Sequence, residues 1–381
     1  MKIGIEAQRL FRSHKHGMDI VALELIRALQ ILDTQNEYFI FVKSDSDNTC
    51  LNETSNFHII EVPGKNYVFW EQIMLPIYAQ KYGVEVLHCT SNTSPIFLSM
   101  PLILTLHDVI FMEKTTGKNT SSNYQKFGNL YRKWLVPKVV RKCKSIVTIS
   151  EVEKNNISKS LDLSNDEITV VHNGVSGRFG IKPSIETIYK VRKQLSLDSD
   201  FFLFLGNVEP RKNVNNTVKA FVAFAEINAE VKLVITGIKP SFVADILYEI
   251  GKISYLNRFV FAGFVAENVL LTLYAEAKVF LYPSLREGFG LPILEAMTFG
   301  TPVVTSNISA MPEVAGDAAF LVNPFSIKEI TNAMTIAYKN DALRNEKIAL
   351  GYLRPNMFTW QKTAEKMLNI YKGRSPEVLA I

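Results

Sequence analysis

The chain has 381 residues, of which 47% are hydrophobic and 21% charged, values that are ordinary for a soluble globular protein. A single hydrophobic core rarely grows past about 250–300 residues, so this length favours two domains. The net charge of +5 suits an anionic small ligand or a loose membrane contact and is too weak to indicate nucleic acid binding.

The start of the chain, MKIGIEAQRL, has the pattern of a strand and not that of a signal peptide. No run of about 18 apolar residues occurs that could span a bilayer. The cysteines Cys50, Cys89 and Cys143 lie far apart without metal-ligand spacing, which favours a reducing compartment. We therefore expect a cytoplasmic protein.

Short runs rich in β-branched and aromatic residues alternate with longer amphipathic runs almost to the end of the chain. Several of the short runs (LILTL, VKLVI, VFLY) are apolar throughout, as expected for strands buried on both faces of a parallel sheet. Helical periodicity marks residues 21–32 and 214–227. This alternation predicts a doubly wound α/β fold. The predicted strands are 2–7, 38–42, 58–62, 86–90, 102–106, 146–149, 169–172, 201–205, 232–236, 259–263, 280–282, 303–306 and 320–322.

The strand–helix pattern restarts after residues 173–184 (NGVSGRFGIKPS), which contain three glycines and one proline and are the best linker candidate. We predict one Rossmann-like domain over residues 1–178 and a second over 179–356. The last helix, at about 357–373, has no strand after it, and we expect it to pack back on the first domain. Ligands of such sheets bind outside the carboxyl ends of the strands, here in a cleft between the domains.

The strongest candidate site follows the strand at 280–282. Residues 285–292 (LREGFGLP) lead into a helix whose first turn suits Pro292, and the two glycines allow a ligand close to the backbone. Free amides at the helix start attract phosphate. Glu287 lies before the helix, and we predict Glu295 in its first turn. Their carboxylates are suited to accept hydrogen bonds from vicinal hydroxyls on either side of that phosphate. The residues alone leave a second interpretation open, a helix N-terminus with favourable acidic residues.

The segment EGFGLPILEAMTFGTPVVTSNISAMPEVAGDAAFLVNP resembles the donor-binding core of retaining glycosyltransferase family 4, which has the GT-B fold of two facing Rossmann-like domains. The hallmark of the family is two glutamates separated by seven residues, here Glu287 and Glu295. GNVEPRKN at 206–213 resembles the phosphate-binding loop of the second domain. Further counterparts are FWEQIMLP (69–76), LHDVIF (106–111), TISEVEKNNI (148–157) and VHNGV (171–175), so the resemblance runs in order from residue 1 to about 373.

The resemblance implies roles for the second domain. Glu295 would hold the ribose hydroxyls and Glu287 would face the transferred sugar. Lys212, with Arg211, would neutralise the leaving diphosphate of an oxocarbenium-like transition state. The backbone amides that would contact sugar and diphosphate belong to Gly288, Phe289, Gly290 and Leu291.

Two further positions come from the same resemblance. Many relatives carry an arginine directly after the glycine that corresponds to Gly206, where this chain has Asn207, so that part of the cationic clamp is either missing or supplied by Arg211. Phe264 and Val265 match the place where relatives hold the base through backbone groups, which leaves the base undetermined.

In the first domain the resemblance places His107 against the donor sugar, with Asp108 orienting neighbouring groups. A lone histidine after a strand is more often structural, and His88 and His172 keep that interpretation. Gly17 falls in the loop that approaches the diphosphate and acceptor. Relatives often have Gly-x-Gly there, and the acid at Asp19 in this chain disfavours the phosphate contact and is compatible with a different acceptor.

The Asp-x-Asp strings at 45–47 and 198–200 resemble metal-binding motifs, but one lies in a polar loop and the other precedes a strand, so we predict no metal and no cofactor. Residues 131–145 (YRKWLVPKVVRKCKS) hold six basic residues and no acid. They fit either peripheral contact with anionic lipid or an ordinary solvated helix face.

The resemblance therefore implies a metal-independent, retaining hexosyltransferase of surface polysaccharide or lipopolysaccharide biosynthesis. Its donor would be a nucleotide sugar, GDP-mannose first and a UDP-sugar second, because FWEQIMLP and EPRKN resemble mannosyltransferases. The acceptor would be a saccharide or a lipid-linked saccharide. Two alternatives share this architecture: a sugar-nucleotide epimerase or phosphorylase, and a non-catalytic nucleotide-sugar-binding subunit.

Overall fold

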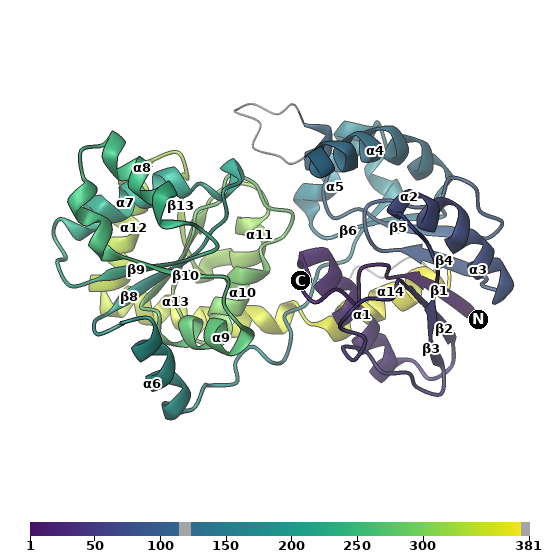
Figure 1. The fold of residues 1–381 in the computed structure, drawn as a ribbon, viewed down its shortest axis with the longest axis horizontal. Helices are drawn as coiled ribbons and strands as arrows, with labels where there is room; N and C mark the ends of the chain where they lie inside the picture. Colours follow the sequence, from purple (N-terminus) through teal and green to yellow (C-terminus); the bar gives the residue numbers. More distant parts are fainter. Residues whose placement is uncertain (114–122, 375–381) are drawn as a thin grey trace. The chain divides into compact units, whose positions relative to one another are not determined.

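The structure is a computed structural model that describes residues 1–113 and 123–374. Internal contacts divide the chain into two compact units (Figure 1). Unit 1 is Met1–Gly174 together with the chain from Thr359 onward, and unit 2 is Val175–Phe358. The first division lies within the predicted linker, four residues before the predicted boundary at 178.

Unit 1 is built on a sheet of seven strands in the order β3-β2-β1-β4-β5-β6-β7, and all neighbouring strands are parallel. The central strands β1 and β4 are almost wholly buried because helices cover both faces of the sheet. The strand bounds are β1 Lys2–Glu6, β2 Glu37–Val42, β3 Phe57–Glu61, β4 Val86–Cys89, β5 Leu102–Thr105, β6 Ser145–Thr148 and β7 Ile168–Val170.

One face of this sheet carries α1 (Gly17–Leu32) and the last helix, α14 (Trp360–Tyr371), which lie side by side (Figure 1). Met367 and Tyr371 of α14 are buried in the same core as Ile3 and Ile5 of β1, which explains a helix with no strand after it. The other face is covered by α2 (Tyr67–Phe69), a π-helix (Trp70–Met74), α3 (Leu75–Lys81), α4 (Asn123–Val139) and α5 (Glu151–Leu161).

Unit 2 is built on six strands in the order β10-β9-β8-β11-β12-β13, again parallel throughout. The helices α7 (Val214–Ala225), α8 (Pro240–Glu249) and α12 (Ile327–Lys339) pack on one face around Phe202 and Phe221. The other helices are α6 (Ile185–Gln194), α9 (Glu267–Glu276), α10 (Leu291–Thr298), α11 (Met311–Ala315) and α13 (Asp341–Leu353). The strand bounds are β8 Phe201–Leu205, β9 Lys232–Thr236, β10 Phe259–Gly263, β11 Val279–Tyr282, β12 Val303–Ser306 and β13 Phe320–Val322.

The prediction of two doubly wound parallel sheets is confirmed, and each predicted strand occurs within two residues of its predicted ends. The helix predicted from residue 21 begins at Gly17, so Gly17 opens a helix and does not lie in the loop where we placed it. The last helix begins at Trp360 because the Thr359 side chain accepts a hydrogen bond from the Lys362 amide and caps it. Among the described residues, no helix has the length and apolar character needed to cross a membrane.

Candidate functional site

The turn that carries Arg211 and Lys212 is fixed by the residue that follows it. Asn213 has a left-handed backbone (φ 56°) and is 6% exposed. Its side-chain amide donates to the carbonyls of Pro283 (2.9 Å) and Pro324 (2.8 Å). These prolines follow β11 and β13, so one side chain from the loop after β8 is bound at the ends of two other strands, which fixes the positions of Arg211 and Lys212.

Glu287 is the centre of the site in unit 2. Its Oε1 accepts a hydrogen bond from Lys212 Nζ (2.7 Å), and its Oε2 accepts one from Arg211 Nη1 (2.8 Å). Glu287 is 8% exposed. Burial raises the pKa of Glu287, but the ammonium of Lys212 and the guanidinium of Arg211 outweigh that effect and lower it. The carboxylate is therefore ionised at neutral pH, as a buried charge must be when cations surround it.

The two cations have additional partners. Lys212 Nζ also donates to the Tyr282 hydroxyl (3.1 Å), and Arg211 Nε donates to Glu209 (2.6 Å), whose side chain is half exposed. Two positive charges share one buried carboxylate, and charge-assisted hydrogen bonds hold them in fixed positions. Such preorganised cations can stabilise negative charge on an incoming or departing phosphate with little reorganisation.

The turn before α10 places Glu287 by backbone contacts. The Ser309 hydroxyl donates to the Glu287 carbonyl (2.8 Å) and accepts from the Glu287 amide (3.1 Å). Gly290 has φ 115°, a conformation that side chains rarely adopt, and α10 begins directly after it at Leu291. Gly288 and Phe289 complete the turn between Glu287 and the helix.

Glu295 is the fifth residue of α10 and therefore lies in its second turn, so the prediction that placed it in the first turn was wrong. The left-handed Gly290 sets the helix start, which sequence periodicity does not locate to one residue. Glu295 Oε2 accepts from the Tyr274 hydroxyl of α9 (2.8 Å). Burial raises the pKa of Glu295 to about 7, against the lowering effects of Tyr274 and the Arg178 charge.

The two glutamates have different neighbours. Glu287 lies among cations, whereas Glu295 has one tyrosine donor and the more distant Arg178. Burial raises the pKa of Tyr282, and the charges of both carboxylates add to that rise. Tyr274, Tyr282 and Ser309 were missed as site residues. The position of Tyr282, at the end of a buried strand directly before the glycine turn, was the available signal.

The loop after β8 differs from the expected cationic clamp. The Asn207 side chain accepts from the Glu209 amide (2.9 Å) and so stabilises its own loop. A Cβ on Gly206 would lie 3.0 Å from Ile238 and from Phe204, so the backbone there is closely packed. Val265 follows β10 and is half-buried, next to Phe264, which is 97% exposed.

In unit 1, His107 follows β5 and is 4% exposed. Its amide donates to Asn92 Oδ1 (2.6 Å), and its ring Nε2 lies 2.8 Å from the Thr90 carbonyl. Because a carbonyl only accepts, Nε2 carries the hydrogen, and Nδ1 of the neutral ring is the acceptor. Burial lowers the pKa of His107, so the ring stays neutral at pH 7. Asp108 accepts from the Ile110 amide (3.1 Å) and shapes the following turn.

The loop that contacts His107 is held by a buried carboxylate that sequence reasoning did not single out. Glu71, in the π-helix, is 2% exposed and accepts hydrogen bonds from four side chains. They are Tyr67 (2.9 Å), Thr93 (2.5 Å), Gln72 (2.9 Å) and Tyr131 (2.6 Å). Thr93 lies in the same polar segment, 90–94, as the two residues that contact His107. The polar run at residues 90–94, directly after the buried strand β4, was the sequence signal that could have identified this loop.

Gly17 is exposed as the first residue of α1, after the N-cap His16. The Asp19 side chain accepts from the His16 amide (3.0 Å), so the acid that replaces the second glycine caps the helix. His88 hydrogen-bonds Tyr371 and Thr105 in the core, which confirms its structural interpretation.

The Asp-x-Asp strings have local partners. Asp47 pairs with Lys15, and Asp198 pairs with Lys232 (2.7 Å). Within residues 1–113 and 123–374, no group of three or more His, Cys, Asp or Glu side chains is placed to hold a metal ion. The predicted site residues thus fall into two sets, Gly17 and His107 in unit 1 and the remainder in unit 2.

Two protein-family models match the chain in separate ranges. Residues 16–176 match Glycosyltransferase Family 4, and residues 186–353 match Glycosyl transferases group 1. The first range lies mostly in unit 1 and the second wholly in unit 2. The second contains Glu287, Glu295 and Lys212.

Curated relatives agree with these matches, and a solved structure shares the fold. O-antigen chain mannosyltransferase B of Escherichia coli is 30% identical over 237 residues, which are 60% of this chain and 60% of that protein. Serotype-specific mannosyltransferase WbdA of Escherichia coli is 32% identical over 225 residues, 58% of this chain but 28% of that protein. Anabaena HepE, solved in complex with UDP and glucose, superposes with a TM-score of 0.72 at 17% identity, covering 98% of this chain and 99% of its own.

Proposed function

Because the chain belongs to the glycosyltransferases, with family 4 and group 1 domains and the GT-B fold, we propose that it transfers a hexose from a nucleotide sugar to a saccharide or lipid-linked saccharide acceptor. The observation that supports this most is the buried Glu287 carboxylate with Lys212 and Arg211 on its two oxygens. The N-terminus of α10 and two fixed cations follow strands of one sheet, and both features suit a diphosphate leaving group.

The donor in this proposal is GDP-mannose first and a UDP-sugar second. The first choice has support from the names of the relatives, which are O-antigen and serotype-specific mannosyltransferases. The second has support from HepE, whose structure holds UDP and glucose. The names of the same relatives support an acceptor glycan of O-antigen type.

In the proposed reaction the bond from the anomeric carbon to the diphosphate oxygen breaks as the bond to the acceptor oxygen forms on the same face. The acceptor proton passes to the departing diphosphate, and the configuration is retained. Lys212 and Arg211 stabilise the charge that develops on the diphosphate. Glu287 faces the sugar, and the amides of residues 288–291 contact sugar and diphosphate. No metal ion takes part.

The remaining groups bind the donor in this proposal. Glu295, when ionised, accepts hydrogen bonds from the ribose hydroxyls. Gly206, Asn207 and Val265 line the nucleotide, the last through its backbone. From unit 1, the proposal assigns the Nδ1 acceptor of His107 to the donor sugar, and Gly17 to contact with the diphosphate and acceptor.

We place the reaction in the cytoplasm, with peripheral contact to the inner face of the membrane through residues 131–145. A lipid-linked acceptor would require such contact, and the basic composition of this segment supports it.

The test is a transfer assay with purified protein, a panel of nucleotide sugars and an O-antigen-type oligosaccharide. Thermal-shift screening selects the donor first, because a specific ligand stabilises the folded state by mass action. Glu287→Ala is expected to abolish release of nucleoside diphosphate with acceptor while nucleotide binding stays measurable. Wild-type turnover in Glu287→Ala, or conversion of the donor alone without acceptor, would overturn the assignment.

A further inference from the structure

Exposed hydrophobic side chains of unit 1 are concentrated in three segments. In the part of unit 1 that the structure describes, ten large hydrophobic residues are exposed, and seven of them lie in 69–77, at 97 and in 127–134. Scattered single exposures are normal, whereas a concentration of this kind marks an interaction surface. The seven residues are Phe69, Ile73, Ile77, Phe97, Phe127, Leu130 and Trp134.

The three segments form one continuous surface, because Gln72 connects them. Its amide nitrogen donates to the Tyr131 hydroxyl (2.8 Å) on α4 and to the Ser94 carbonyl (2.9 Å). Its amide oxygen accepts from the Ile96 amide (3.0 Å). We call this surface, residues 69–81, 94–100 and 126–144, the α3–α4 face.

Helical spacing separates the outer side of α4 from its inner side. Leu135 and Val139 are fully buried in the core of unit 1, whereas Leu130 is 66% exposed and Trp134 52% exposed. Phe127, Leu130 and Trp134 are three and four residues apart and therefore share the outward side. The segment 131–145, for which we propose membrane contact, therefore lies partly in the core of unit 1. The exposed hydrophobic residues of α4 begin one turn earlier, at Phe127.

The α3–α4 face is strongly basic. It contains eight lysines and arginines and one acid, Glu71, which is 2% exposed and has four hydrogen-bonding partners. The net charge of the whole chain is +5, so the remainder of the chain is slightly negative. Two of the ammonium groups lie over exposed rings: Lys138 is 3.8 Å from the Trp134 ring centre and Lys142 is 5.0 Å from that of Phe97.

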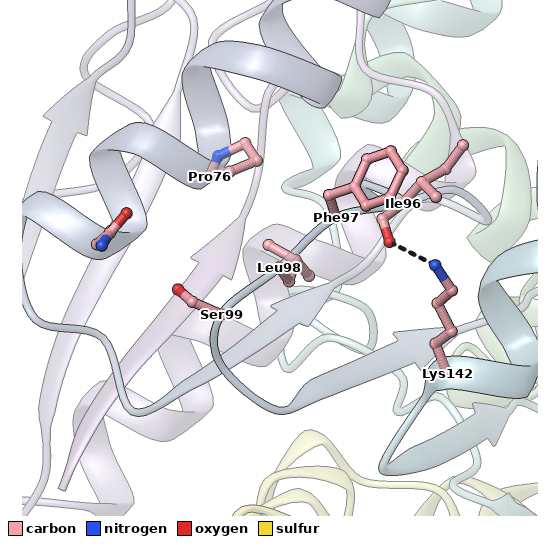
Figure 2. A pocket seen from close by; sticks show the side chains of 7 residues that line it. Pro76, Ile96, Phe97, Leu98, Ser99 and Lys142 are labelled. Carbon is pink, nitrogen blue, oxygen red and sulfur yellow. Dashed lines mark hydrogen bonds between the residues drawn. The ribbon is translucent and has the colours of Figure 1, made fainter.

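A pocket of about 450 Å³ opens within this face (Figure 2). Its lining includes Pro76 and Gln80 of α3, residues 96–99, and Lys142. Figure 2 shows the Lys142 ammonium donating to the Ile96 carbonyl (3.2 Å) beside the Phe97 ring. None of the predicted transfer residues lines it.

We propose that the α3–α4 face docks unit 1 on an anionic lipid bilayer, with Phe97, Leu130 and Trp134 entering the interface and the surrounding lysines contacting lipid phosphates. Exposed aromatic and aliphatic side chains flanked by basic residues, with no exposed acid, match the interfacial boundary of such a membrane in polarity and charge. This inference rests on the proposed function in one respect: docking on a bilayer brings the enzyme to a lipid-linked acceptor.

The test is co-sedimentation of the full chain with vesicles of phosphatidylcholine alone and of phosphatidylcholine with phosphatidylglycerol. We expect binding to the anionic vesicles and at least about tenfold weaker binding to the neutral ones. Leu130→Ser/Trp134→Ser and Lys133→Glu/Lys138→Glu are each expected to weaken anionic-vesicle binding at least about tenfold. Circular dichroism and thermal unfolding check that the variants fold.

Matched controls change exposed residues elsewhere. Ile31→Ser removes a hydrophobic side chain that is 86% exposed on unit 1, and Lys239→Glu/Lys328→Glu makes the same charge change on unit 2. Both should bind vesicles as the wild type does. The proposal is overturned if the wild type does not bind, if it binds neutral vesicles equally, or if the controls lose as much binding as the face variants.

Two further measurements separate the alternatives. A dimer that Leu130→Ser/Trp134→Ser dissociates, measured by light scattering, would assign the face to a second copy of the chain and overturn lipid docking. Transfer to a soluble oligosaccharide should be unchanged in the face variants. Loss of vesicle binding with transfer intact therefore separates failure of docking from failure of the proposed function.

Discussion

Lys212 Nζ and Glu287 Oε1 lie 2.7 Å apart, in a pair whose side chains are 14% and 10% exposed. Removing one partner of a buried ion pair leaves the other charge uncompensated, which is more costly than removing both. The pair therefore serves the fold as well as the proposed chemistry, and a double replacement separates the two roles.

We predict that Lys212→Met destabilises the chain by about 2 kcal/mol, because the Glu287 carboxylate keeps only Arg211 as a cationic partner. Glu287→Gln/Lys212→Met should regain most of that stability. Transfer should fall at least about 100-fold in both variants, since the charge on the leaving diphosphate loses a fixed cation. Urea unfolding and nucleoside diphosphate release measure the two effects. If activity returned together with stability in the double variant, Lys212 would be structural only.

We predict that Glu71→Leu destabilises unit 1 by about 3 kcal/mol, because four side-chain donors, one buried and three partly buried, lose an acceptor at once. Glu71→Gln keeps the shape and part of the bonding and should cost less. Glu37→Gln, on a carboxylate whose side chain is 42% exposed, is the control. Equal unfolding midpoints for Glu71→Leu and Glu37→Gln would show that the cluster around Glu71 does not stabilise the fold.

The same cluster predicts an effect on His107. Thr93 donates a hydrogen bond to Glu71. In the same segment, the Thr90 carbonyl accepts from the His107 ring, and the Asn92 side chain accepts from the His107 amide. Glu71→Gln should therefore lower kcat about tenfold with little change in KM, if His107 acts on the donor sugar. His107→Ala combined with Glu71→Gln should be no slower than His107→Ala alone. Additive losses in the double variant would contradict this route.

We predict that excess EDTA leaves the rate of transfer unchanged, because Lys212 and Arg211 supply the positive charge that a divalent ion would otherwise bring to the diphosphate. The measurement is the initial rate of nucleoside diphosphate release before and after chelation and gel filtration. Recovery of a lost rate on adding back Mg²⁺ or Mn²⁺ would show that the two cations are insufficient.

The strands could be predicted because each is a short run rich in β-branched and aromatic residues, and several are apolar throughout, as buried parallel strands are. Other features depend on contacts that sequence spacing does not contain. The pairing of Glu287 with Lys212 joins residues 75 positions apart, and the ligands of Glu71 come from three separate segments. Trp134 and Leu135 are neighbours in sequence, yet Trp134 is exposed and Leu135 is buried. The composition of the segment does not show which residues of the helix face outward.

Glu295 predicts a pH dependence of stability in the free protein. Its pKa is about 7 in the folded chain against 4.5 as its ordinary value, so between these pH values the folded state holds a proton that the unfolded state has lost. The protonation of Glu295 stabilises the folded state, and this contribution to the free energy of unfolding is fully present below pH 4.5 and is lost as the pH rises to about 7. Thermal unfolding of Glu295→Gln should lack that decline, so the wild type should lose stability relative to the variant across this window.

Donor binding should show the opposite trend, because only the ionised Glu295 accepts hydrogen bonds with both oxygens. With a pKa of about 7, the ionised fraction rises about tenfold between pH 6 and pH 8, and affinity for the nucleotide sugar should rise about as much. Calorimetric titration with a nucleotide sugar avoids the terminal phosphate of a free nucleotide, which titrates in the same range. Glu295→Gln should bind weakly with a flat profile. If wild-type affinity were also flat while the stability difference appeared, Glu295 would titrate as described but would not hold the ribose.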